Sequence, residues 1–576
     1  MSMRTILSAG VFAAAFLAAV PAAAQPDAAA PDGAGDELAG GWSDGPPEAQ
    51  SPEEAAPPRR ARRDRRGGRG RASAHPRIEI APYVEVNAGI SAELSGDDDD
   101  VLTYSTVAAG VDGRVQTRRV TAQASYRYER RIALDGDIAE DDVHSGVAMV
   151  HAQVAPGISL DAGALAAEAG GEGRGLTLSD RDSSAQVFSA YAGPTINTQI
   201  GALSVGAAYR LGYVRVDDND LAGDFGDDFG ESIVHNATAS VGMGPGPLPF
   251  GWTVGGGYVR EESGEFENRF RAAYVRGDVV FPVGPTLALT AGVGYEHITS
   301  SQQDLLRDAS GAPILVGGRF VPDPTRPRLR GFDTDGIIYD GGIIWRPNPR
   351  TELQARAGRR YGGTTVTASL QHQLPRGLGL SANVYDTVGN AATTIVSNLN
   401  ALPTDFQVNR NPLTGAFDGC VFGNDPGTGI CFDQAFQTLS SASFRARGAN
   451  LLLSGSRGPW GFGLGAGYAH RRYTALISGD IRSIDPVTDD SFVVNAGVSR
   501  RLGRFSSMSI DAVAAWYDND RPLSDSIFST GMTAGYYRSF FIPGLQFHAG
   551  LGLYHTDNGL FDSTVLNGLV GLRYTF

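Results

Sequence analysis

The sequence contains two cysteines, which lie close enough together in the chain to form a disulfide. Cys420 and Cys431 lie eleven positions apart in the longest connection between predicted strands, residues 389–442. In an oxidising compartment such a pair is expected to form a disulfide, and a free reactive pair of thiols is the alternative. Closing a loop of this size contributes on the order of 3 kcal/mol. The link would therefore fix a local lobe, but it would not fold the whole chain.

The other side chains that can do chemistry form no catalytic or ligand-binding pattern. The sequence has no GxSxG, no HExxH, no P-loop and no paired CxxC. Its nine His residues form no ligand-spaced cluster, and we interpret His548 as a polar lining residue. Glycines fill every second position of residues 461–467, which places them on one face of a strand and not in a nucleotide loop. We therefore predict that the protein is not an enzyme and has no catalytic residues, cofactor or metal ion.

Strands must position these residues, and the last strand has the clearest pattern. Counting back through residues 562–576, Phe576, Tyr574, Leu572 and Val570 fall on one face, and mostly polar residues and glycines fall on the other. This period of two, ending on an aromatic residue, is typical of a strand between lipid and a polar lumen. The strand resembles the assembly signal of bacterial outer-membrane β-barrels, which end on a Phe. An edge strand of a soluble protein is the alternative.

The beginning of the chain predicts export. Residues 1–24 contain Arg4 as their only charge, then an apolar run, and Ala22-x-Ala24 before Gln25, which is a signal-peptide pattern. The rest of the sequence has no uninterrupted apolar run of about eighteen residues, so no helical membrane span is predicted. The first 76 residues contain no Cys that a lipid could modify. We therefore expect a barrel to be the membrane anchor.

Residues 25–76 are predicted to be a disordered periplasmic tether. The first half is acidic and rich in Pro, Ala and Gly, and the second half carries eight Arg residues against a single Asp64. Neither half has enough apolar side chains to bury. The Arg run has no interleaved aromatic residues, so nucleic acid is not a predicted partner. The predicted partners are a periplasmic polyanion, inner-leaflet lipid or the acidic half itself, and a solvated spacer is the alternative.

From residue 77 onward the sequence predicts an all-β fold. We expect residues 77–576 to form a transmembrane antiparallel up-and-down β-barrel of about 22 strands, within a range of roughly 18–24, and an even count places both termini in the periplasm. The alternation slips in 184–195 and 443–455, where a bulge or a miscounted strand is expected. The predicted strands span residues 77–94, 102–116, 119–133, 143–155, 157–168, 184–195, 200–216, 231–243, 249–261, 267–282, 285–299, 335–346, 350–361, 364–373, 377–388, 443–455, 459–471, 490–501, 505–517, 526–540, 544–556 and 562–576.

The connections alternate between short and long. The short ones are mostly turns of Pro and Gly such as Pro156-Gly157, and many of the long ones are acidic, as in residues 97–100 and 217–231. Arg, Asp and Glu sum to about −29 over the long set and about +9 over the short set. Short periplasmic turns and long external loops are the barrel convention. Acidic loops can share divalent cations with lipopolysaccharide, and basic turns can face the anionic inner leaflet, although surface solubility explains the acidic loops equally well.

Residues 77–576 resemble the porin-type outer-membrane barrels. The segment begins Arg-Ile-Glu-Ile-Ala-Pro-Tyr-Val-Glu-Val and ends Gly-Leu-Arg-Tyr-Thr-Phe. Some members of that group are associated with exopolysaccharide or exosortase systems. The resemblance implies a protein of the cell outer membrane, in contact with its lipid and lipopolysaccharide and inserted by the barrel assembly machinery.

We predict a porin-like channel for the passive diffusion of small polar solutes, because the charged, Pro-rich tether cannot supply a folded plug domain. One alternative is the outer-membrane barrel of an exopolysaccharide secretion or assembly system. Another is a structural surface barrel with a closed lumen.

A barrel of about 22 strands leaves a wide channel that another part of the chain must narrow. The connection that carries Cys420 and Cys431 is the longest, and it contains apolar residues that a solvated loop would not need. We expect it to fold into or over the lumen and to set the conductance. The alternative constriction is the loop of residues 300–334, which carries the basic residues Arg319, Arg326, Arg328 and Arg330.

Deleting Phe576 should leave the protein exported but not assembled, because the assembly of such barrels is read from the final strand. The measurement is the amount of protein in isolated outer membranes beside the amount in the periplasm. Normal membrane levels of the truncated protein would refute the assignment.

Overall fold

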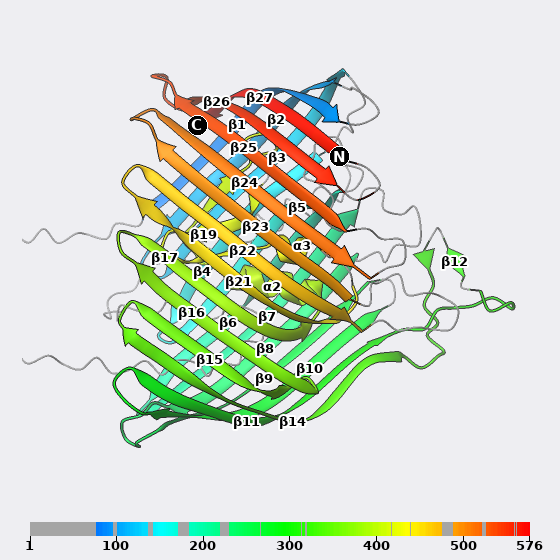
Figure 1. Ribbon diagram of the computed structural model, residues 1–576, viewed down its shortest axis with the longest axis vertical. Helices are drawn as coiled ribbons and strands as arrows, with labels where there is room; N and C mark the ends of the chain where they lie inside the picture. Colours follow the sequence, from blue (N-terminus) through cyan, green and yellow to red (C-terminus); the bar gives the residue numbers. More distant parts are fainter. Residues whose placement is uncertain are drawn as a thin grey trace, which may run out of the picture.

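The computed structural model describes residues 77–95, 101–135, 142–170, 184–218, 230–264, 267–312, 314–316, 319–415, 417–437, 439, 441–474, 488–520, 526–557, 559 and 562–576 (Figure 1). The signal peptide predicted at 1–24 and the tether predicted at 25–76 lie outside these residues. So do residues 97–100 and most of the acidic run at 217–231.

The described residues form one antiparallel sheet of 22 strands, which confirms the predicted fold class and count. Each strand pairs with the next along the ring, and β27 pairs with β1 and closes the sheet into a barrel. The strands are β1 (Arg77–Ser95), β2 (Val101–Gln116), β3 (Val120–Asp135), β4 (Asp142–Ala155), β5 (Ile158–Gly170), β6 (Ser184–Ile200), β7 (Leu203–Asp218), β8 (Glu231–Met243), β9 (Gly251–Ser263), β10 (Asn268–Pro282), β11 (Leu287–Gln302), β14 (Leu329–Asn348), β15 (Thr351–Arg360), β16 (Gly363–Leu374), β17 (Leu378–Gly389), β21 (Phe444–Arg457), β22 (Trp460–Tyr473), β23 (Thr488–Arg501), β24 (Ser506–Asn519), β25 (Ile527–Ser539), β26 (Leu545–Asp557) and β27 (Asp562–Thr575).

Alternation along each strand separates an apolar outer face from a lumen face. In β26, Leu551 is 64% exposed on the outside, whereas His548 on the lumen side is 6% exposed. The four predicted outer residues of the last strand are also exposed, with Phe576 at 72%. Exposed large apolar side chains recur on most strands, a distribution that suits lipid and not water. The outer face is therefore that of a transmembrane barrel.

Neither expected irregularity is a β-bulge. In β6 the pairing with β7 lapses between Ala192 and Thr195, where Pro194 has no N–H to donate, but the register is the same on both sides of the gap. The bulge expected in 443–455 is wrong, since β21 pairs without a register shift with both β17 and β22. The strand predicted at 335–346 is longer in the structure, where β14 begins at Leu329.

The connection between β17 and β21 contains its own secondary structure. It holds α2 (Ala391–Asn400), β18 (Phe406–Arg410), β19 (Phe417–Gly423), β20 (Gly429–Cys431) and α3 (Asp433–Phe436), and its three strands form a separate small sheet. Cys420 and Cys431 face each other across β19 and β20 and form a disulfide. We call residues 390–443 the lumen lobe.

The other long described connection, between β11 and β14, contains the two-residue strands β12 (Leu315–Val316) and β13 (Arg319–Phe320), which pair with each other. Figure 1 shows this hairpin projecting beyond one end of the barrel, at the end opposite the short turns. Among the described residues, no helix is both long and apolar enough to cross a membrane.

Candidate functional site

One side of the lumen lobe packs through apolar contacts. Helix α2 begins with a capping box, in which the Asn390 side chain accepts from Thr393 N and the Thr393 hydroxyl accepts from Asn390 N. Its buried face, including Ile395 and Leu399, belongs to one core cluster with residues of β4 to β8. Burying each such side chain contributes about 1.5–3 kcal/mol. This apolar face therefore fixes the lobe to the β4–β8 wall.

The other side of the lobe is bonded to β22 and β23. Asn495 of β23 donates to Asp433 Oδ2 (2.7 Å), and the Arg471 guanidinium of β22 donates to the Gln434 carbonyl. In the closed ring, β22 and β23 lie half a circuit away from β5 to β8. The lobe therefore spans the lumen from one wall to the opposite wall, and Figure 1 shows α2, α3 and β19 within the outline of the barrel.

The alternate glycines of β22 share one face of the strand, as predicted, and that face is turned toward the lumen lobe. A Cβ at Gly463 would meet the Phe422 ring, and one at Gly465 would meet both sulfur atoms of the disulfide. A Cβ at Gly467 would meet Gln434. The wall has no side chains at these positions because the lobe lies directly against its backbone.

A third set of contacts joins the end of β18 and the segment after it to the wall near the barrel closure. Arg410 donates to Ser145 Oγ (3.0 Å) and Ser125 Oγ (3.0 Å), and Asn411 Nδ2 donates to the Tyr554 hydroxyl (2.8 Å). Leu413 packs in a small cluster with Tyr104, Tyr554 and Leu569. The lobe is thus held on three sides.

The lumen wall carries buried charges that are paired within a strand or between strands. Arg127 Nη2 lies 3.1 Å from Glu85 Oε1, and Arg131 Nε donates to Glu129 Oε1 (2.6 Å). A buried charge is costly unless it is paired and hydrogen-bonded, and such pairs suit a polar surface better than an apolar core. The lumen wall is therefore polar at these residues, in contrast to the apolar cluster on β4–β8.

The four arginines of the predicted alternative constriction are spread along the β11–β14 connection. Arg319 lies in β13, and Arg326 donates to Asp304 Oδ2 (3.0 Å). Arg328 donates to Ser301 Oγ (3.2 Å) and to the Glu267 carbonyl, and Arg330 donates to Asp333 Oδ2 (2.9 Å). These bonds tie the connection to itself and to the neighbouring strand ends. A role for these arginines in narrowing the channel stays a prediction.

The residues that anchor the lobe were not singled out from the sequence. Asn390, Arg410, Asp433 and Asn495 lie in a connection or on a lumen face, where polar residues are ordinary. The only available signal was the run of glycines in 461–467, whose regular spacing marks a strand that something approaches closely.

No protein-family model matches the chain, and no curated protein matches its sequence. Among solved structures, the chain is similar to the alcaligin outer-membrane receptor FauA of Bordetella pertussis, with 13% identity, a TM-score of 0.36, and 86% of this chain and 76% of that chain covered. The FrpB iron transporter of Neisseria meningitidis (F5-1 variant) has 10% identity, a TM-score of 0.42 and coverages of 86% and 82%. The ferric-catecholate import receptor Fiu of E. coli K12 has 10% identity, a TM-score of 0.42 and coverages of 85% and 81%.

Similarity at this level extends at most to the fold. The function therefore has to be inferred from the residues of the lumen. The closed sheet, the apolar outer face and the polar lumen wall are the features of a bacterial outer-membrane β-barrel.

Replacing Gly465 with Val should displace the lobe, because the new side chain occupies the position of the disulfide sulfurs. Limited proteolysis with mass spectrometry should show faster cleavage within residues 390–443 than in the wild type. Gly461→Val is the matched control, since a Cβ there meets only the side chain of Ser499 and not the lobe. Equal protection of the lobe in all three proteins would contradict the packing described.

Docking of the lobe should weaken as the pH rises. Burial raises the pKa of Asp433 to about 6, although the hydrogen bond from Asn495 opposes this. A raised pKa stabilises the folded state below the ordinary Asp value, and this contribution, on the order of 3 kcal/mol, is lost as the pH rises through 6. Asp433→Asn should remove this dependence between pH 4 and pH 7, as measured by hydrogen exchange of the lobe at each pH. An unchanged pH dependence in the variant would exclude Asp433 as its source.

Proposed function

We propose that the protein is an outer-membrane channel for small polar solutes whose conductance is set by the lumen lobe. The single observation that carries this proposal is the lobe itself, which joins opposite walls of a barrel wide enough to conduct. The paired charges of the lumen wall support a path for water-soluble molecules rather than for lipids.

The lobe can move without breaking the barrel, because it is an insertion between two strands that pair with each other. Gly389 at the end of β17 lies opposite Phe444 at the start of β21. The barrel hydrogen bonds therefore do not depend on residues 390–443. With both termini on the periplasmic side, as we also propose, the lobe enters the lumen from the external end.

A structural barrel with a closed lumen is the second candidate. The observation that favours it is the number of walls that hold the lobe, through the apolar cluster on β4–β8, the bonds to β22 and β23, and the contact with β26. A lobe that never leaves these walls would leave no path for a solute.

Conductance in planar bilayers separates these two functions. Because β17 and β21 are paired up to Gly389 and Phe444, a short Gly-Ser turn can replace residues 391–442. We expect the single-channel conductance to rise several-fold, since the material that crosses the lumen is removed.

The double substitution Cys420→Ser and Cys431→Ser is a milder change, because it removes the disulfide but keeps the lobe. We expect the single-channel conductance to rise less than in the deletion, or to become noisier. Heat-dependent mobility in gels checks that each barrel is folded. If the lobe-free barrel conducts no better than the wild type, the constriction lies elsewhere, and the β11–β14 connection becomes the next candidate. If neither folded barrel conducts, the channel assignment fails.

A further inference from the structure

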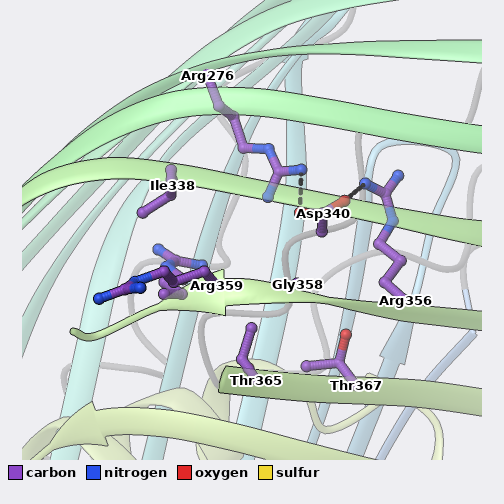
Figure 2. A pocket seen from close by; sticks show the side chains of 9 residues that line it. Arg276, Ile338, Asp340, Arg356, Gly358, Arg359, Thr365 and Thr367 are labelled. Atoms are coloured by element: carbon purple, nitrogen blue, oxygen red, sulfur yellow. Dashed lines mark hydrogen bonds and ion pairs between the residues drawn. The ribbon is translucent and has the colours of Figure 1, made fainter. Parts of the chain in front are cut away.

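A small hollow opens on the lumen wall formed by β14, β15 and β16. The atom-free space in and in front of it is about 300 Å³, which includes open solvent, and the enclosed part has room for about one water-sized group. Figure 2 shows Arg276 and Arg356 on either side of Asp340, with Thr365 and Thr367 of the next strand rising toward the same space. Residues from β14, β15 and β16 thus meet at one place on the wall, together with Arg276 of β10 on the far side of β11.

Both carboxylates beside the hollow already accept hydrogen bonds from arginines. Arg276 Nη2 donates to Asp278 Oδ1 (2.7 Å) and Asp340 Oδ2 (2.7 Å), and Arg276 Nε donates to Asp278 Oδ2 (2.9 Å). Arg356 Nη1 donates to Asp278 Oδ1 (2.8 Å) and Asp340 Oδ1 (3.0 Å). All four carboxylate oxygens therefore accept at least one hydrogen bond.

The remaining hydrogen-bonding groups around the hollow are mainly donors. Arg356 Nη2 is buried and has no hydrogen-bond partner among the described residues. Leaving a buried donor unpaired is unfavourable, and more so when it carries charge. The hydroxyls of Thr365 and Thr367 can also donate. A group that completes this site must therefore accept hydrogen bonds.

The net charge of the surrounding residues also favours a negatively charged ligand. Next to the four residues above, Arg360 donates to Glu296 Oε2 (2.8 Å), and Arg445 and Arg447 share Asp386. With Arg359, which also lines the hollow, these arginines outnumber the four carboxylates, so the surroundings of the hollow carry a net positive charge. A negative charge on the bound group would offset it.

We propose that this hollow binds an oxyanion carried by a small solute, such as the carboxylate of an acidic sugar. The inference rests on the proposed function and refines it, because it names the class of solute that the channel would favour. Guanidinium and hydroxyl donors on neighbouring strands suit the two oxygens of such a group, and charge-assisted hydrogen bonds are the stronger kind.

Binding to the purified full-length protein in detergent tests the site without any conductance. Isothermal titration uses sodium glucuronate, inorganic phosphate and glucose as probes. Glucuronate and phosphate distinguish a carboxylate from a phosphate as the preferred group, and glucose tests whether the hydroxyls of a sugar suffice. We expect an oxyanion to bind, and glucose at the same concentrations not to bind.

Two variants examine the donors separately. Arg356→Lys keeps the charge beside Asp278 and Asp340 but removes the second guanidinium donor, and Thr367→Val removes one hydroxyl with little change in shape. Each should weaken oxyanion binding, Arg356→Lys by roughly tenfold. Thr364→Val is the matched control, because this residue is exposed on the outer face of the same strand.

Equal binding by the wild type and both variants would overturn the site, and so would a wild type that binds neither anion. These results are distinct from a failure of the channel. A protein that binds glucuronate but never conducts would refute the proposed function and leave the site standing. If the lobe-free barrel conducts but both variants bind oxyanions normally, the channel function stands and the site is refuted.

Discussion

Pairing between the first and last strands is the constraint on which the rest of the structure depends. A strand edge exposed to lipid leaves backbone N–H and C=O groups without partners, at a cost of several kcal/mol for each group. The ladder between β1 and β27 removes both edges at once. Closure fixes the circumference at 22 strands, and a ring of that size leaves a lumen that its own side chains cannot fill.

The lumen lobe occupies this space, and two kinds of contact hold it there. Toward β4–β8 it presents α2 and an apolar cluster, which depends little on orientation. Toward β22 and β23 it presents directed hydrogen bonds, such as the one between Asn495 and Asp433, and it fits against a wall that has glycines in place of side chains. The first contact holds the lobe in the lumen, and the second fixes its position there.

Much of the fold could be predicted from the sequence, because the alternation of apolar and polar residues in a lipid-facing strand depends only on residues close together in the chain. The closing strand with Phe576, the number of strands and the disulfide between Cys420 and Cys431 were all predicted correctly. Contacts between distant segments were not, since nothing near Arg410 in the sequence indicates Ser145, and nothing near Asp433 indicates Asn495. The bulge expected in 443–455 was wrong for a related reason. Small and charged residues there blur the alternation, although β21 keeps its register through its two neighbours.

The disulfide lies inside the barrel, with its sulfur atoms against the backbone of Gly465. Cys420 is 1% exposed, whereas Cys431 is partly exposed. The barrel wall therefore limits the access of a reductant to this bond while the lobe is docked. The disulfide that shapes the lobe is in turn shielded by the wall against which the lobe packs.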